Sequence, residues 1–158
     1  MTDLRNVSGG IADRFEIEAL RGEFTDAGMT RDYDRFASLF TADGVWRIPQ
    51  AGIGFTGRAE IRAGIERLQD TWDYFVQAIH PGVIRLADDG TATGRTYVAE
   101  FGRMRDGSSH RNHSVYHDGY RRTGDGWRFT ERVYGVLYVD TAPLTGSAPG
   151  SEEYLGPR

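Results

Sequence analysis

The first half of the chain places apolar residues at helical spacing in three segments. Residues 14–29 carry four of them, near the i, i+3, i+7 spacing of a helix with one buried face, at Ile17, Leu20, Phe24 and Met29. Asp32 is placed to cap a second, short helix with apolar residues at Phe36, Leu39 and Phe40, followed by a turn over 41–44. A strand is then predicted over 45–49, and a third helix from residue 58 to about residue 69.

From Tyr74 onward the pattern changes to β-rich runs separated by turn sequences. Four strands are predicted, at Phe75–Leu86, Ala92–Met104, Asn112–Arg122 and Trp127–Val139. Three helices followed by an antiparallel meander predict an α+β fold with the helices packed on one face of the sheet. Both faces of the last strand are mostly apolar, so we expect a second copy of the chain to cover the outer face, giving a dimer or trimer.

The 158 residues suit one domain, for which we expect three parts. These are a flexible N-terminus over 1–13, a folded domain over 14–140 and a tail rich in Gly, Pro and Ser over 141–158. The polar start lacks the apolar core of a secretory signal, and no run approaches the roughly 20 apolar residues of a membrane span, so we expect a cytoplasmic protein without membrane contact.

Composition excludes several kinds of site and partner. The chain has no cysteine, and all its basic residues are arginines scattered along a chain of net charge −4, which is untypical of a nucleic-acid binder. His110, His113 and His117 lie on a predicted loop and strand where they do not form a recognisable metal triad. We therefore expect neither a nucleic-acid partner nor a metal site, and assign the histidines to the surface or an interface.

The chain resembles a known family in the order of its elements and in three segments, which are Ala37–Trp46, Ile79–Gly82 and Tyr120–Phe129. It resembles the SnoaL-like family of the nuclear-transport-factor-two-like superfamily, in particular the branch with scytalone dehydratase and lindane dehydrochlorinase. The resemblance implies a conical barrel, a strongly curved antiparallel or mixed sheet with the three N-terminal helices on its concave face. It also implies proton-transfer chemistry without a cofactor.

The resemblance also implies site residues. The family's sheet histidine falls on His80 and its last-strand arginine on Arg132. The acid that partners the histidine falls on Met29, and a helper Lys or Tyr falls on Phe24, so the usual His–Asp pair is incomplete here. Asp26 is a candidate for the pocket edge, since it precedes Met29 on the same helix.

Strand alternation, combined with the positions that the resemblance implies, places Glu100 on the inner face of its strand. A buried carboxylate needs a partner, so we expect it to pair with Arg132, to do acid–base work, or both. His80, Arg132 and Glu100 are therefore the predicted catalytic residues. The predicted substrate-binding residues are Phe24, Met29, Trp46, Ile48, Val98, Ser114, Tyr116, Tyr134 and Val136.

The leading functional hypothesis is a cofactor-independent lyase, isomerase or cyclase that acts on a small hydrophobic metabolite, such as a polyketide, terpenoid or steroid-like compound. His80 would move the proton, and Arg132 would stabilise a developing oxyanion. The alternative is a catalytically silent ligand-binding or assembly module with the same pocket. A third possibility is the small subunit of a ring-hydroxylating oxygenase.

Overall fold

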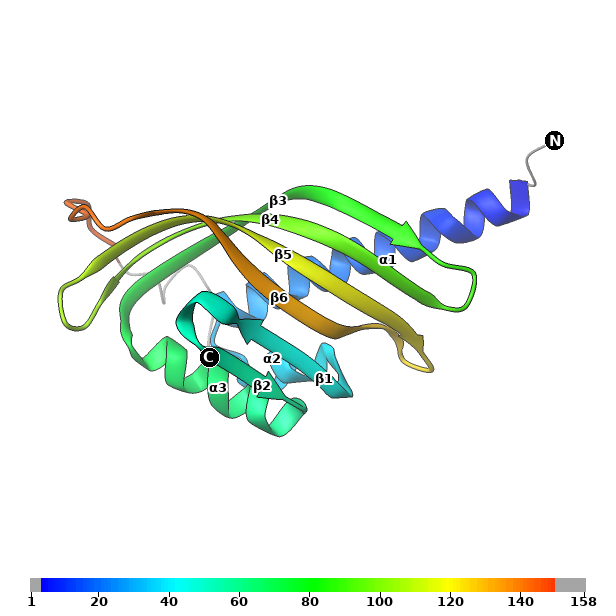
Figure 1. The fold of residues 1–158 in the computed structure, drawn as a ribbon, viewed down its shortest axis with the longest axis horizontal. Coiled ribbons are helices and arrows are strands. Elements are labelled where there is room, and N and C mark those ends of the chain that lie inside the picture. The colour runs from blue at the N-terminus through cyan, green and yellow to red at the C-terminus, as the bar shows by residue number, and fades with distance from the viewer. Residues whose placement is uncertain (1–3, 150–158) are drawn as a thin grey trace.

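The computed structural model describes residues 4–149, in which three helices lie along a strongly curved sheet (Figure 1). The helices are α1 (Leu4–Met29), α2 (Tyr33–Ser38) and α3 (Arg58–Asp70), and a 3-10 turn, η1, spans Pro49–Ala51. The strands are β1 (Phe40–Ile48), β2 (Ile53–Thr56), β3 (Trp72–Leu86), β4 (Thr91–Met104), β5 (Ser109–Thr123) and β6 (Gly126–Asp140). This is the predicted α+β class with a mixed sheet.

The six strands form one sheet in the order β2-β1-β6-β5-β4-β3. Only the β1–β6 pair is parallel within this described sheet; the other neighbours are antiparallel. The sheet curves around its contents like part of a cone, but its edge strands β2 and β3 do not pair, so it is not closed into a barrel. Its long strands β3 to β6 are the four predicted from alternation, whereas the short β2 was not predicted.

Helix α1 begins at Leu4, well before the predicted start at residue 14. Around its middle it is tied to the sheet, because Arg14 donates a hydrogen bond to the carbonyl of Ile84 (2.6 Å) and Asp13 accepts one from the Trp127 indole (3.0 Å). The exposed Ile11 and Phe15 break the apolar periodicity there, which hid the early start from the sequence pattern. Residues 1–3 of the expected flexible N-terminus and 150–158 of the expected tail lie outside the described residues.

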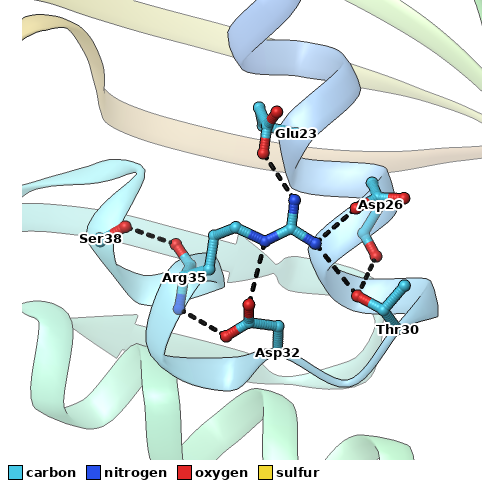
Figure 2. A network of polar contacts seen from close by, with 6 residues as sticks. All are labelled: Glu23, Asp26, Thr30, Asp32, Arg35 and Ser38. Atoms are coloured by element: carbon cyan, nitrogen blue, oxygen red, sulfur yellow. Dashed lines mark hydrogen bonds and ion pairs between the residues drawn. The ribbon is translucent and has the colours of Figure 1, made fainter. Parts of the chain in front are cut away.

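The link between α1 and α2 is held by Arg35 (Figure 2). The Asp32 side chain caps α2 as predicted, accepting from the Arg35 amide (3.1 Å), and it also accepts from the Arg35 guanidinium (3.2 Å). The same guanidinium pairs with Glu23 (2.6 Å) and with Asp26 of α1. Asp26 is exposed in this surface network and therefore does not fill the place of the missing first-helix acid.

The inside of the curved sheet has a packed half and an open half. In the packed half, Ile17 and Leu20 of α1 are buried against Tyr120, Trp127 and Phe129. In the open half, a cavity lies between the helices and the sheet. On the helix side it is lined by the C-terminal turns of α1 and by α2 and α3. On the sheet side it is lined by the starts of β3 and β5 and the ends of β4 and β6. The fold thus separates a solid core from a space large enough for a ligand.

Candidate functional site

A cavity of about 680 Å³ occupies the open half of the fold. Its walls are mostly apolar and aromatic, and three of its polar residues, Gln77, Asn112 and Tyr134, surround the carboxyl group of Glu100. Leu137, Tyr138 and Val139 of β6 line it and are also more than half exposed, so they lie at its mouth. Small-molecule sites of this size combine an apolar wall with a few oriented polar groups, and this cavity has that character.

Glu100 is positioned by alternation on β4, where Thr96, Val98 and Glu100 all point inward and are buried. Its Oε2 accepts a hydrogen bond from the Tyr134 hydroxyl (2.5 Å), and its Oε1 accepts one from the Gln77 amide (2.6 Å). The Thr25 hydroxyl of α1 donates to Gln77 Oε1 (2.7 Å), which turns the amide nitrogen of Gln77 toward Glu100. Helix α1 and strands β3 and β6 therefore hold one carboxyl group.

Burial raises the pKa of Glu100, because desolvation penalises its charged form. Hydrogen bonds from Tyr134, Gln77 and Asn112 act in the opposite direction and only partly offset this effect. No ion pair with Glu100 is formed by any Arg or His of residues 10–149. A carboxyl group in an apolar cavity, with its pKa moved toward neutrality, is suited to both giving and taking a proton.

Tyr116 and Tyr134 stand beside Glu100 with their rings in edge contact, 5.1 Å between centroids. The pKa of each hydroxyl is raised, first by burial and then by the nearby charge of Glu100. Both therefore stay protonated at neutral pH and act as hydrogen-bond donors. The Tyr134 hydroxyl is committed to Glu100, whereas the Tyr116 side chain lies along the cavity wall at the level of Phe24.

Arg132 does not pair with Glu100, contrary to the expectation from the sequence. Its guanidinium is buried in the packed half, where it forms an ion pair with Asp118 (2.8 Å). Asp118 also accepts hydrogen bonds from Thr96 and Tyr120. The physical reason is register: Asp118 lies directly opposite Arg132 on the next strand, whereas Glu100 is on the strand beyond and opposite Asn112.

Aromatic rings separate Arg132 from the cavity. The guanidinium carbon lies 4.3 Å from the ring centroid of Phe24 and 4.0 Å from that of Tyr116, and both residues line the cavity while Arg132 does not. Burial alone lowers the pKa of Arg132, but Asp118 outweighs it and the pKa is raised. Arg132 is thus a permanently charged residue beneath the cavity floor, and direct stabilisation of an oxyanion by Arg132 does not fit this geometry.

His80 is likewise not brought to the cavity. Gln77 and Ile79 of β3 point inward, so alternation places Ala78 and His80 on the outer face, where both are exposed. A bulge between His80 and Val83 then resets the alternation and returns Ile84 to the core. The predicted meeting of His80, Glu100 and Arg132 in one pocket is wrong: only Glu100 lines it.

Most of the predicted substrate-binding residues line the cavity, namely Phe24, Met29, Trp46, Ile48, Tyr116, Tyr134 and Val136. Val98 and Ser114 point inward but are buried in the packed interior and do not reach it. The cavity is also lined by residues that were not among the predicted site residues, namely Gln77, Asn112, His110, Trp72, Phe75 and Met104. Asn112 and Gln77 are the direct pairing partners of Glu100 on β5 and β3, so alternation extended from Glu100 across the two registers could have found both.

Residues 4–149 contain no group of three His, Cys, Asp or Glu side chains placed to hold a metal ion. Within the same residues, no helix combines the length and apolar character that a bilayer crossing requires.

The comparisons with known proteins agree with the fold. Among curated protein sequences none matches, but the model of the SnoaL-like domain family matches residues 10–133. A hexachlorocyclohexane dehydrochlorinase, LinA-type3 from Novosphingobium barchaimii LL02, has 19% identity and a TM-score of 0.77, covering 87% of this chain and 93% of that chain.

Two proteins from Novosphingobium aromaticivorans are also similar. One, assigned as a scytalone dehydratase, has 16% identity and a TM-score of 0.77, covering 92% of this chain and 98% of its own. The other, assigned as an aromatic ring hydroxylase, has 25% identity and a TM-score of 0.74, covering 90% of this chain and 98% of its own. Since the family model spans most of the chain, this protein belongs to the SnoaL-like domain family.

Proposed function

We propose that this protein is a cofactor-independent lyase, isomerase or cyclase in which Glu100 transfers a proton on a small, largely apolar metabolite such as a polyketide, terpenoid or steroid-like compound. The observation that carries the proposal is the placement of Glu100, a buried carboxyl group at the wall of an apolar cavity, held by Tyr134 and Gln77 and by no cation of the described residues. This replaces the proton-transfer role first expected of His80.

In this mechanism the ionised Glu100 removes a proton from the carbon next to a carbonyl group, and the electron pair of the C–H bond moves onto the carbonyl oxygen. The protonated Glu100 then returns the proton to carbon, or gives it to a β-hydroxyl group that leaves as water when its C–O bond breaks. Tyr116, which stays protonated, donates a hydrogen bond to the oxygen on which charge develops. Gln77 and Tyr134 orient the carboxyl group through separate oxygens. The aromatic wall around them holds the apolar part of the substrate and excludes water.

The comparisons support the general class of chemistry. Two proteins of similar structure are named a dehydrochlorinase and a dehydratase, and both names denote eliminations. Elimination needs a base at the end of a substrate pocket and a donor near the leaving group. The pair of Glu100 and Tyr116 supplies these functions here from side chains of the sheet.

One observation favours a second candidate, a ligand-binding module without catalysis. Phe24 and Met29 occupy the positions of the family's helper residue and acid. The sulfur of Met29 accepts a hydrogen bond from the Gln77 backbone amide (3.3 Å), but it cannot act as an acid. His80 also faces away from the cavity. A binding module needs the cavity and its polar group, but it does not need Glu100 to exchange protons with the bound molecule.

The two candidates are separated by hydrogen–deuterium exchange on bound carbonyl compounds. The protein would be incubated in deuterated water with neutral apolar ketones and β-hydroxyketones, including any molecule retained through purification, and followed by NMR. The enzyme proposal expects deuterium next to the carbonyl or loss of water, with Glu100→Gln slowing either by about 10²–10⁴-fold. Compounds that bind without exchange or elimination identify a binding module.

Asp125→Asn is the matched control, because it removes one carboxylate from an exposed turn far from the cavity lining. It should react at the wild-type rate. An unchanged rate in Glu100→Gln, with the fold intact by circular dichroism, would show that another group moves the proton.

We also propose that the protein self-associates through the outer face of the sheet, as a dimer or trimer. Tyr97 and Phe101 of β4 point outward and are 39% and 42% exposed, so this face presents large apolar side chains to solvent. Static light scattering at micromolar concentration should give a mass of two or three chains. A monomer mass, or an unchanged mass in a Tyr97→Glu, Phe101→Glu variant, would contradict this assignment of the interface.

A further inference from the structure

The charges around the cavity are unevenly distributed. The ionisable side chains that line it are those of Glu100, His110 and three tyrosines. No arginine of the described chain lines it. The buried Arg132 is already neutralised by Asp118 (2.8 Å) in the packed half. The negative charge that the ionised Glu100 brings to the cavity is therefore not balanced by an arginine of the described chain.

The hydrogen bonds at Glu100 leave it able to accept another donor. An ionised carboxylate has about four lone-pair positions. Tyr134 uses one on Oε2 and Gln77 uses one on Oε1, and Asn112 also donates to the group. These donors are neutral, so they stabilise the charged form without cancelling its charge.

The rest of the wall suits a cation with an apolar body. Trp46, Trp72, Phe75 and Tyr116 line the cavity, and the faces of aromatic rings attract positive charge. The protein already uses this interaction directly below, where the Arg132 guanidinium lies 4.3 Å from the Phe24 centroid and 4.0 Å from the Tyr116 centroid. Rings that accept a cation on their buried side are thus part of the cavity floor.

We infer that the cavity binds hydrophobic primary amines in their protonated form, with the ammonium group on Glu100 and the apolar body against the aromatic wall. The ammonium group donates to the free lone pair of the carboxylate and supplies the missing positive charge. Because burial disfavours the charged form of Glu100, a bound cation also stabilises the ionised state that burial penalises. The inference concerns binding and does not require turnover.

The test compares three probes with the same naphthalene ring: 1-naphthylmethylamine, 1-naphthalenemethanol and 1-naphthoate. Isothermal titration calorimetry at pH 7.5 should give a dissociation constant for the amine at least about tenfold lower than for the alcohol, the difference expected from one charge-assisted contact in a buried site. Naphthoate should not bind measurably, because it would place a second negative charge beside Glu100.

Glu100→Gln should remove the preference for the amine while the alcohol still binds, and Asp125→Asn should retain it. Equal affinities for amine and alcohol in the wild type, a preserved preference in Glu100→Gln, or no binding by any probe at millimolar concentration would each overturn the inference. Failure of the proposed reaction has a different signature, since deuterium exchange can be absent while the selective binding of the amine remains.

Discussion

Asp118 and Glu100 are buried carboxyl groups on the inner faces of neighbouring strands, β5 and β4, but they face different surroundings. Asp118 is surrounded by an arginine and two hydroxyl groups, and all of them are protein groups in the packed half. Glu100 has only neutral partners and borders the cavity. Full internal pairing indicates a structural role, whereas incomplete pairing beside a cavity leaves a carboxyl group available to a ligand.

The largest effect on stability is expected from a substitution at Asp118. We expect Asp118→Asn to lower the free energy of unfolding by about 3–5 kcal/mol, because it leaves the charge of Arg132 buried without its counter-ion. Urea unfolding followed by circular dichroism measures this loss. The double variant Asp118→Asn, Arg132→Met removes both charges and should recover most of the stability, even if the single variant does not fold. If the double variant is no more stable than Asp118→Asn, the loss of stability is not caused by the unpaired charge of Arg132.

Glu100→Gln should have a smaller effect on stability, and one that depends on pH. The folded-state pKa of Glu100 is raised, so its favourable contribution is complete below the unfolded value of 4.5 and is lost as pH rises through the folded pKa. The stability of Glu100→Gln relative to the wild type should therefore increase from pH 4 to pH 8. Urea unfolding of both proteins across this range measures the trend, and a constant difference would mean that the pKa of Glu100 is not raised.

Arg35 provides a contrast with Arg132, because its network of acidic partners lies at the surface (Figure 2). We expect Arg35→Ala to lower the free energy of unfolding by about 1 kcal/mol, since exposed ion pairs are weakened by solvent and salt. Thermal unfolding at low and high salt measures it. A loss as large as that of Asp118→Asn would show that the α1–α2 link is energetically part of the core.

The smallest effect is expected at His80. Because its side chain is exposed on the outer face of β3, His80→Ala should change the free energy of unfolding by no more than about 0.5 kcal/mol and leave binding to the cavity unchanged. Urea unfolding and the naphthalene probes test both statements. A large loss of binding or turnover in His80→Ala would contradict the assignment of the site to Glu100.

Strand alternation predicted the inner face of β4 and β5 correctly, because their mutual pairing runs from Thr91 to Arg103 without a register shift. The error at His80 came from the resemblance, which implied a histidine at this position without showing which face of β3 it lies on. Pro81 and Gly82 mark the bulge that follows, but residue types alone do not fix how a bulge changes the register. Features that depend on one inserted residue are thus the hardest to obtain from sequence.

The partner of Arg132 illustrates a second limit. Glu100, Asp118 and Arg132 all lie on the inner face of the sheet, and alternation alone cannot choose between the two carboxyl groups as the partner of Arg132. The choice depends on the β5–β6 register, in which Thr123 pairs with Gly126 at the turn but a shift between Gly119 and Tyr120 brings Asp118 opposite Arg132. With no shift, Asp118 would lie opposite Glu131 instead. One bulge near the hairpin turn therefore determines which buried carboxyl group is neutralised.

The stacking of Arg132 beneath Phe24 and Tyr116 also bears on how this protein can change over evolutionary time. The floor of the cavity is supported from below by the ion pair of Arg132 and Asp118, neither of which lines the cavity. Substitutions at Ile48, Leu68 or Val136 can reshape the upper wall without disturbing that support. The fold can thereby acquire new specificities through a few wall residues while retaining the same foundation, which makes this cavity a favourable starting point for directed evolution.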